Sequence, residues 1–203
     1  TMSSSLRPEE ELNAPDVSPP TEVSHLYDFS LSWGGRLVED MLWFFGNLNL
    51  ISRIQTTPFI PWTDPLGNEH RRFYSKDTQT MSFLKLSSQF LPQLKVSATA
   101  SYTDRYLSAW EPSLSWNIAE DATQVLNHQN NFNASGAISY IIDQNTFIDL
   151  KGGYFQQKIP LHLNQEGLKN PQYFNEGSGH LWGSSGLNEN RLGRRFQASA
   201  SLT

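Results

Sequence analysis

Apolar and polar residues alternate one by one through much of this 203-residue chain. Successive side chains of a β-strand point to opposite faces, so a period of two predicts strands with one apolar and one polar face. Seven segments show the pattern, at 27–33, 42–50, 78–90, 94–103, 131–140, 146–155 and 196–202. The alternation therefore predicts an all-β fold of about seven strands.

The polar faces of these segments consist mainly of serine, threonine, asparagine and glutamine. Charged residues make up only 17% of the chain, against about 25% in an average soluble domain. The outer face of a soluble sheet carries more charge, whereas the wet and crowded lumen of a membrane barrel suits small neutral polar residues. Segments 94–103 and 131–140 also have the length of about 9–11 residues with which a tilted strand crosses a bilayer.

Short and long connections between the segments alternate strictly. The short links are 34–40, 91–94 and 142–145, and the long ones are 53–77, 104–129 and 156–190. In an up-and-down sheet this order places every long loop at one end. Aromatic residues cluster near the strand ends, at Trp33, Trp43, Phe44, Tyr102, Tyr140, Tyr154 and Phe155. Together these features predict an antiparallel, up-and-down segment of a transmembrane β-barrel, with short periplasmic turns and long extracellular loops.

The segment 42–50 contains two asparagines among large apolar residues. Asn47 and Asn49 share one face with Trp43 and Phe45. Phe44, Leu48 and Leu50 alternate with them on the other face. We therefore expect the asparagines to point into a barrel lumen, the second set to face lipid, and Trp43 and Phe45 to lie near the periplasmic rim.

Composition excludes several classes of protein. The chain has no cysteine, which rules out disulfides, cysteine zinc sites and thiol nucleophiles. The net charge of −5 comes without a basic stripe, so nucleic acid is not an expected partner. No apolar run approaches the roughly 18 residues of a membrane helix. Residues 1–24 lack the pattern of a secretory signal and are expected to form an extracellular loop, with strands and loops from 25 to 203.

Three stretches carry a resemblance to a known family. They read "TEVSHLYDFSLSWGGRLVEDMLWFFGNLNL", "FLKLSSQFLPQLKVSATASYTDR" and "AEDATQVLNHQNNFNASGAISYII". They resemble consecutive hairpins in the barrel of TonB-dependent outer-membrane receptors, in the group with an N-terminal carboxypeptidase-regulatory-like domain. Gly34 and Gly35 match a turn at a strand end in that group, and Leu42 to Gly46 match the run that opens the next strand. The likeness covers roughly 21–155 and is weaker beyond.

The resemblance implies a function in transport and a location in the bacterial outer membrane. Such receptors import a scarce ligand, for example a siderophore, an oligosaccharide, a peptide or cobalamin, and the TonB–ExbB–ExbD system acts on their plug domain. This chain would supply barrel wall and external loops. Its partners would be outer-membrane lipid, the rest of the barrel and the plug. No plug, TonB box or terminal aromatic residue is found, so we expect a fragment of a barrel of about 22 strands or one piece of a split receptor.

The long loops hold the candidate ligand-binding residues. Exposed aromatic side chains can stack on sugars or other flat ligands, although loop packing or rim anchoring is the simpler use. The candidates are Trp62, Trp110, Trp116 and Trp182, with Tyr173 and Phe174 beside them. Arg71 and Arg72 in "NEHRRF" could contact an anionic siderophore or a lipopolysaccharide phosphate, or simply be solvated.

No motif for catalysis, cofactor or metal binding is apparent. The histidines 25, 70, 128, 162 and 180 lack the spacing of metal ligands, and "GSGHLWGSSG" does not fit a nucleophile elbow. We therefore expect no enzyme activity and no cofactor. Two alternatives remain open: a soluble β-sandwich that binds carbohydrate through its loop tryptophans, and a passive structural or pore-forming barrel subunit.

Overall fold

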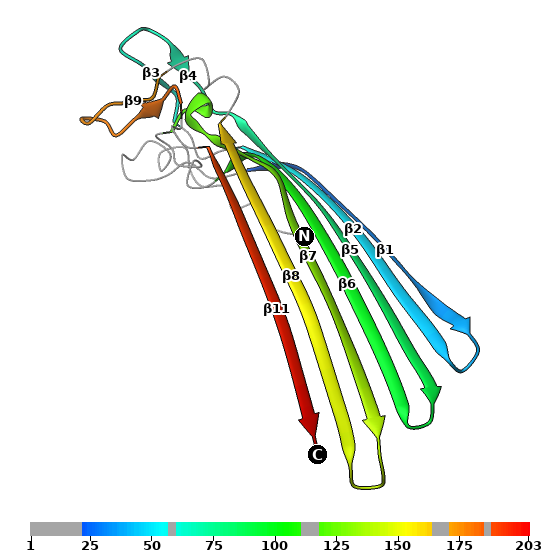
Figure 1. The fold of residues 1–203 in the computed structure, drawn as a ribbon. Helices are drawn as coiled ribbons and strands as arrows, with labels where there is room; N and C mark the ends of the chain where they lie inside the picture. The colour runs from blue at the N-terminus through cyan, green and yellow to red at the C-terminus, as the bar shows by residue number, and fades with distance from the viewer. Residues whose placement is uncertain (1–21, 57–59, 111–117, 164–170, 185–187) are drawn as a thin grey trace.

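One seven-stranded antiparallel sheet makes up most of the molecule (Figure 1). The computed structural model describes residues 22–56, 60–110, 118–163, 171–184 and 188–203. The strands of the sheet, in spatial order, are β1 (Val23–Val38), β2 (Leu42–Thr56), β5 (Tyr74–Leu91), β6 (Leu94–Trp110), β7 (Gln124–Ile141), β8 (Phe147–Leu163) and β11 (Glu189–Leu202). Each strand pairs with the next one along the chain, so the predicted all-β, up-and-down arrangement of seven strands is confirmed.

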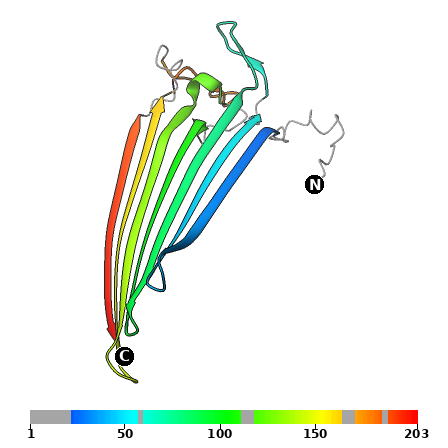
Figure 2. The same cartoon turned by 90° about the vertical axis from the view of Figure 1, so that its right-hand side faces the viewer.

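The sheet is curved, twisted and open (Figures 1 and 2). Among the described residues, β1 pairs only with β2 and β11 only with β8. The short turns lie at one end of the sheet, and the long connections gather at the other. The described residues of these connections contain two small hairpins and a short 3-10 helical turn: β3 (Trp62–Thr63) with β4 (Glu69–His70), β9 (Tyr173–Phe174) with β10 (Leu181–Trp182), and η2 (Glu120–Ala122). No helix in this described part is long and apolar enough to span a membrane.

The strands are longer than the alternation predicts. β6 has 17 residues and β7 has 18, where about 9–11 were expected. The extra length lies at the end of the long connections, where apolar residues such as Leu107, Leu126 and Leu161 lie on the otherwise polar face, so the period-two contrast between the faces disappears. Backbone pairing continues there because it does not depend on the side chains. For the same reason β1 begins at Val23, within the stretch 1–24 expected to be loop; residues 1–21 lie outside the described part.

The predicted Gly34–Gly35 turn is wrong. β1 runs through both glycines to Val38, and they pair in register with Phe45 and Phe44. The turn is formed instead by residues 39–41, with Asp40 at a φ of 54°. Glycine is needed in this strand for space, because a Cβ at Gly34 would lie 3.0 Å from the carbonyl oxygen of Phe44. The short links at 91–94 and 142–145 are confirmed as turns.

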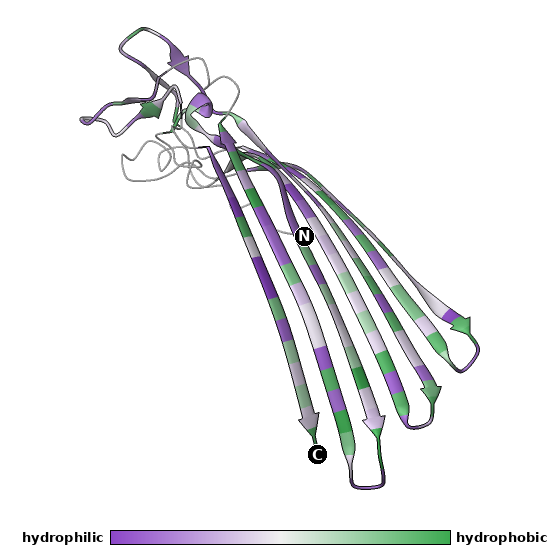
Figure 3. Ribbon diagram, viewed as in Figure 1, coloured by the Kyte–Doolittle hydropathy of each residue, from purple (hydrophilic) through white to green (hydrophobic). Residues whose placement is uncertain are grey.

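The pairing register sorts the side chains onto two faces, as the banding in Figure 3 reflects. One row across the whole sheet contains Trp33, Gly46, Leu84, Ala100, Ala134, Tyr154 and Phe196. The adjacent row contains Gly34, Phe45, Lys85, Thr99, Ser135, Gly153 and Gln197. We call the faces to which these rows belong the apolar face and the polar face. As predicted, Asn47 and Asn49 lie on the polar face, and Phe44, Leu48 and Leu50 lie on the apolar one.

Buried apolar residues occur only at the long-connection end of the described sheet. Leu107, Leu126 and Leu161 are in register on the polar face and form one cluster with Ile159. Phe73 and Ala109 form another, against which Trp62 packs. The described parts of the long connections therefore fold over the polar face, while large side chains of the described apolar face remain exposed.

Candidate functional site: the loop cluster and the polar face

The first long connection is organised by one carboxylate. Asp64 accepts hydrogen bonds from the backbone N–H groups of Leu66 (2.9 Å) and Asn68 (2.8 Å), from Asn68 Nδ2 (2.9 Å), and meets His70 Nε2 at 3.4 Å. Burial alone would raise the pKa of Asp64, but these hydrogen bonds outweigh it and lower the pKa. Gly67, with a φ of +87°, lets the chain turn tightly around the carboxylate. The result holds β3 and β4 as a rigid hairpin.

Two histidines enclose Trp62. The ring of Trp62 stacks on His70 from its own hairpin, at a centroid distance of 4.3 Å, and on His180 from the third long connection, at 4.1 Å. Trp182 meets Trp62 edge-on at 5.3 Å, and Tyr173 stacks on Trp182 at 5.4 Å. We call these five residues the loop aromatic cluster. It joins two connections that are more than 100 residues apart in the sequence.

The second long connection is fastened to the same cluster. Ala119 N–H donates to the carbonyl oxygen of Leu181 (2.9 Å), and Gly183 N–H donates to Asp121 Oδ2 (2.9 Å). Burial raises the pKa of Asp121, against the opposing effects of the Gly183 hydrogen bond and the nearby His70. Burial and the nearby His70 both lower the pKa of His180. Three connections thus pack together at one end of the sheet, with titratable groups at their junction.

The predicted ligand-binding residues have different environments. The structure brings Trp62 and Trp182 together, but as packing residues, since Trp182 is only 8% exposed. Arg71 is exposed and bonded to Glu69, and Arg72 is half-buried with no ion pair among the described residues. Trp110 ends β6 in register with Gln124, and its side chain is outside the described part. Trp116 also lies outside the described residues.

Tyr173 and Phe174 are the exposed aromatic residues of this region, at 37% and 61%. The histidines were expected to hold no metal, and the described residues contain no group of three or more potential metal ligands. Nothing in the sequence indicated that His70 and His180 would stack on the same tryptophan, because this arrangement depends on how two distant connections fold. A spacing rule within one segment cannot detect such a pair.

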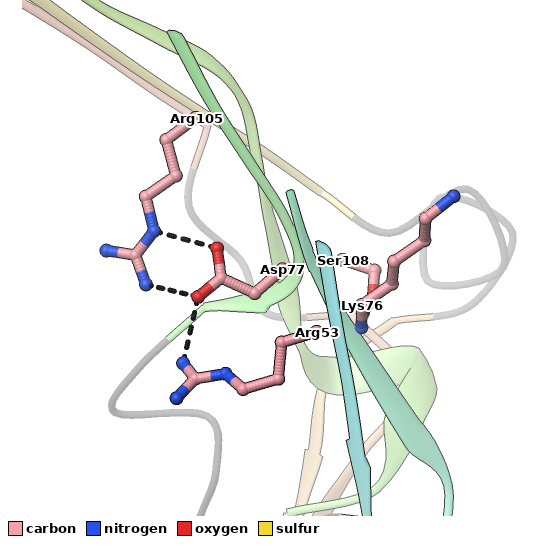
Figure 4. Close-up of polar contacts among 5 residues, drawn as sticks. All are labelled: Arg53, Lys76, Asp77, Arg105 and Ser108. Carbon is pink, nitrogen blue, oxygen red and sulfur yellow. Dashed lines mark hydrogen bonds and ion pairs between the residues drawn. The ribbon is translucent and has the colours of Figure 1, made fainter. Parts of the chain in front are cut away.

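An ion-pair network lies on the polar face just below the loops (Figure 4). Asp77 accepts hydrogen bonds from Arg105 Nε (3.0 Å) and Nη2 (2.9 Å), and from Arg53 Nη2 (2.9 Å). Its side chain is 12% exposed. Beside it, the backbone N–H of Lys76 donates to Ser108 Oγ (2.8 Å). One carboxylate thus ties together three neighbouring strands, β2, β5 and β6.

Basic residues outnumber acidic ones on the polar face. The register places Arg36, Arg53, Lys85, Lys95, Arg105, Lys151, Arg191 and Arg195 there, with Asp28, Asp77, Asp149 and Glu189 as the carboxylates. The whole chain, in contrast, carries a net charge of −5. Acidic residues are therefore concentrated away from this face, which offers a positive field to anything it contacts.

Known proteins offer no guide to this site. No family model matches the chain, and searches of the curated proteins and of the solved structures found no match.

Proposed function

We propose that this chain is part of the wall of a transmembrane β-barrel in a bacterial outer membrane, of the TonB-dependent receptor kind. The proposal rests on one observation above all. In the described part of the chain, the sheet has a continuous apolar face whose large side chains stand exposed, and its opposite face is polar and partly covered by the long connections. A bilayer on one side and a water-filled lumen on the other is the environment that suits both faces.

The apolar face carries a band free of charged residues in the described strands. Large hydrophobic side chains stand exposed on it, among them Phe29, Leu31, Trp33, Leu84, Ile138, Leu150, Phe196 and Leu202. Titratable and charged side chains of the described strands appear on this face only nearer the long connections, among them Lys76, Asp104, Lys158 and Arg194. Soluble proteins rarely expose an apolar patch larger than a few hundred Å². A lipid environment removes the cost of this exposure.

The dimensions of the band fit the outer membrane. On β2 it runs from Leu42 to Leu50, which is nine residues. At about 3.3 Å per residue this is roughly 30 Å of strand, and a tilt of about 40° reduces its height to about 23 Å, close to the ~25 Å apolar band of outer-membrane barrels.

Aromatic residues border the band on four consecutive strands. Tyr102, Phe132, Tyr154 and Phe196 lie on the apolar face of β6, β7, β8 and β11, and their rings follow one another across the sheet. The Phe132–Tyr154 centroids are 6.1 Å apart and the Tyr154–Phe196 centroids 4.8 Å. Charged residues start directly beyond this row, at Asp104 and Arg194. A belt of aromatics between an apolar band and charges is typical of a membrane interface.

The transport function is taken from the resemblance. In this reading the long connections face the outside and the polar face lines the lumen, while a plug and further strands complete the receptor. A soluble carbohydrate-binding sandwich needs a second sheet over the apolar face, and the described residues form no such layer. The alternative, a passive pore or structural subunit, would form the same barrel wall but would not use energy supplied through TonB.

Location and orientation are tested in intact cells. The chain has no native cysteine, so single cysteines report cleanly. A tagged chromosomal copy should fractionate with the outer membrane. Ser178→Cys, in the third long connection, should react with a membrane-impermeant maleimide, whereas Gln144→Cys, in the β7–β8 turn, should react only after permeabilisation. Recovery in a soluble fraction, or the reverse labelling pattern, contradicts the proposal.

Energy coupling is tested by epistasis, which needs no knowledge of the ligand. Deletion of the gene should cause a growth defect under nutrient limitation, and the same deletion should add nothing in a strain that lacks TonB. A defect that adds to the loss of TonB favours the passive pore.

A further inference from the structure

A shallow hollow lies in the polar face across β6, β7, β8 and β11. Its floor consists of small residues, among them Ser97, Ser135, Gly153 and Ser199, and larger side chains surround them. The hollow encloses about 770 Å³, within the range of 300–1,000 Å³ that is usual for ligand pockets. It is separate from the two tryptophans of the described loops, Trp62 and Trp182, which do not contribute to its lining.

The lining combines three kinds of group. Thr99 and Ser135 present hydroxyls, which are 2.6 Å apart, and Asn133 and Gln197 present amides. Phe155 offers an aromatic ring that is 39% exposed. Hydroxyls and amides in this density exchange hydrogen bonds with a polyhydroxylated ligand, and an aromatic ring gives the apolar face of a sugar something to stack on.

Two cations complete the hollow. Lys151 and Arg195 are both exposed and line it, and neither forms an ion pair with a carboxylate among the described residues. With its amide turned to accept, the Gln197 oxygen lies 2.5 Å from Arg195 Nε and 2.7 Å from Nη2, so the two side chains are neighbours on the polar face. The nearest carboxylate along β8, Asp149, accepts a hydrogen bond from Ser139 instead. Two unneutralised cations favour an anionic ligand.

We infer that this hollow is a binding site for an anionic oligosaccharide, one that carries carboxylates on its sugar rings. The guanidinium of Arg195 and the ammonium of Lys151 would bind the carboxylates, Phe155 would stack on a ring, and the hydroxyls and amides would bind sugar hydroxyls. The inference rests on the proposed function, because the hollow lines a lumen only if the sheet is a barrel wall.

The experiment measures binding to the membrane-extracted protein by calorimetry. The probes are trigalacturonate, its neutral counterpart galactotriose, and inorganic phosphate. We expect trigalacturonate to bind at least about ten times more tightly than galactotriose. Lys151→Met with Arg195→Met should abolish this preference, whereas Lys85→Met, a cation of the same face outside the hollow, should leave it intact.

Two neighbouring glycines give a matched steric test. A Cβ at Gly153 would meet only ordinary contacts at 3.6 Å and beyond, and one at Gly152 would lie 4.0 Å from its nearest neighbour, so the backbone accepts a side chain at both. Gly153→Leu fills the hollow and should abolish binding of both trisaccharides. Gly152→Leu places the same side chain on the apolar face and should leave binding unchanged.

Several results overturn the inference. These are equal affinity of the native protein for the two trisaccharides, unchanged binding in the double variant, or loss of binding in Gly152→Leu as in Gly153→Leu. If phosphate displaces trigalacturonate at a similar affinity, the hollow is a simple anion site and the carbohydrate assignment fails. None of these results alters labelling in cells or contact with lipid, so failure here is distinguishable from failure of the proposed function.

Discussion

At the level of single residues, the sequence predicts which face of the sheet a side chain lies on but not which side chain it hydrogen-bonds. The alternation around Asn47 and Asn49 predicts that both leave the apolar face, and they do. Their partners could not be predicted: Asn47 Nδ2 donates to Ser32 Oγ (2.8 Å), and Asn49 Nδ2 donates to Asp28 Oδ1 (3.0 Å). Each contact depends on the exact register of β1 against β2, and a period-two pattern does not determine the pairing partner of any residue.

The ion-pair network around Asp77, which could not be predicted from the sequence, can be tested by substitution. We expect Asp77→Ala to lower the free energy of unfolding by about 1.5–3 kcal/mol, the usual worth of hydrogen bonds to a charged group, because Arg53 and Arg105 would then face each other without a carboxylate. Urea unfolding in detergent measures the loss. The matched control is Asp104→Ala, whose partner His128 is 61% exposed, so its effect should stay within about 1 kcal/mol. Equal losses in both variants contradict the assignment.

His180 should make the loop aromatic cluster sensitive to pH. Burial and the nearby His70 lower its pKa in the folded protein, so the unfolded chain takes up a proton near the ordinary 6.5 while the folded one does not. Its contribution to stability is therefore complete above about pH 6.5 and declines as pH falls toward the lowered pKa. Two carboxylates also face His70, those of Asp64 and Asp121. The pKa of Asp121 is raised in the folded protein, so its protonation at lower pH stabilises the fold and opposes the stability loss caused by His180.

Near-ultraviolet circular dichroism, which reports the stacked tryptophans, measures this dependence as thermal midpoints between pH 7.5 and 5.5. The native protein should lose stability over this range. His180→Gln should flatten the curve, and His162→Gln should not, because His162 hydrogen-bonds Asn188 away from the cluster. A native curve without a slope contradicts the assignment.

At the scale of elements, the sequence predicted the seven strands and the turns at 91–94 and 142–145, but not the strand lengths or the position of the first turn. A strand signal needs one apolar face, and that contrast ends where the chain emerges from the apolar band. Backbone pairing between strands nevertheless continues beyond that point, as between Arg53–Thr56 of β2 and β5. A turn at Gly34 and Gly35 was expected from the resemblance, whereas both lie within β1, and Gly34 leaves space for the carbonyl oxygen of Phe44 on the neighbouring strand. The packing of three long connections was beyond sequence reasoning, since it requires contacts between distant segments.

The β1–β2 pair has a tight contact that can be probed directly. Trp33 covers Gly46 on the apolar face, and a Cβ at Gly46 would lie 2.5 Å from the Trp33 ring. We expect Gly46→Val to displace the indole and to destabilise the protein by about 1–3 kcal/mol. Gly35→Val, where the nearest atom is 3.7 Å away on the flexible ring of Phe44, should cost clearly less. Chemical unfolding followed by tryptophan fluorescence compares the two; equal stability of the two variants counts against this packing.

The whole molecule is a sheet with two chemically distinct faces and, in the described strands, two open edges. Exposed sheet edges recruit other strands, which agrees with a wall completed by further parts of a barrel. On the polar face basic residues outnumber acidic ones, and the long connections cover part of it. Small residues of β6, β7, β8 and β11 leave a shallow hollow in it. Of the predicted ligand-binding tryptophans, Trp62 and Trp182 are the two whose side chains are described, and both pack the long connections together. The search for ligand chemistry therefore moves from the long connections to the polar face of the sheet. Composition and alternation predicted the two faces, but only the register brought Phe155, Lys151 and Arg195 to one place.

The most direct test of the account is contact with lipid along neighbouring residues. Single cysteines at Ser97, Ala98, Thr99 and Ala100 on β6, and at Ala134 and Ser135 on β7, would carry a small fluorophore in the reconstituted protein, and spin-labelled lipid chains would quench it. If the apolar face lies against lipid, quenching alternates strictly, strong at residues 98, 100 and 134 and weak at residues 97, 99 and 135. Uniform quenching, or none at any position, would contradict the claim that the apolar face of this sheet lies against a bilayer.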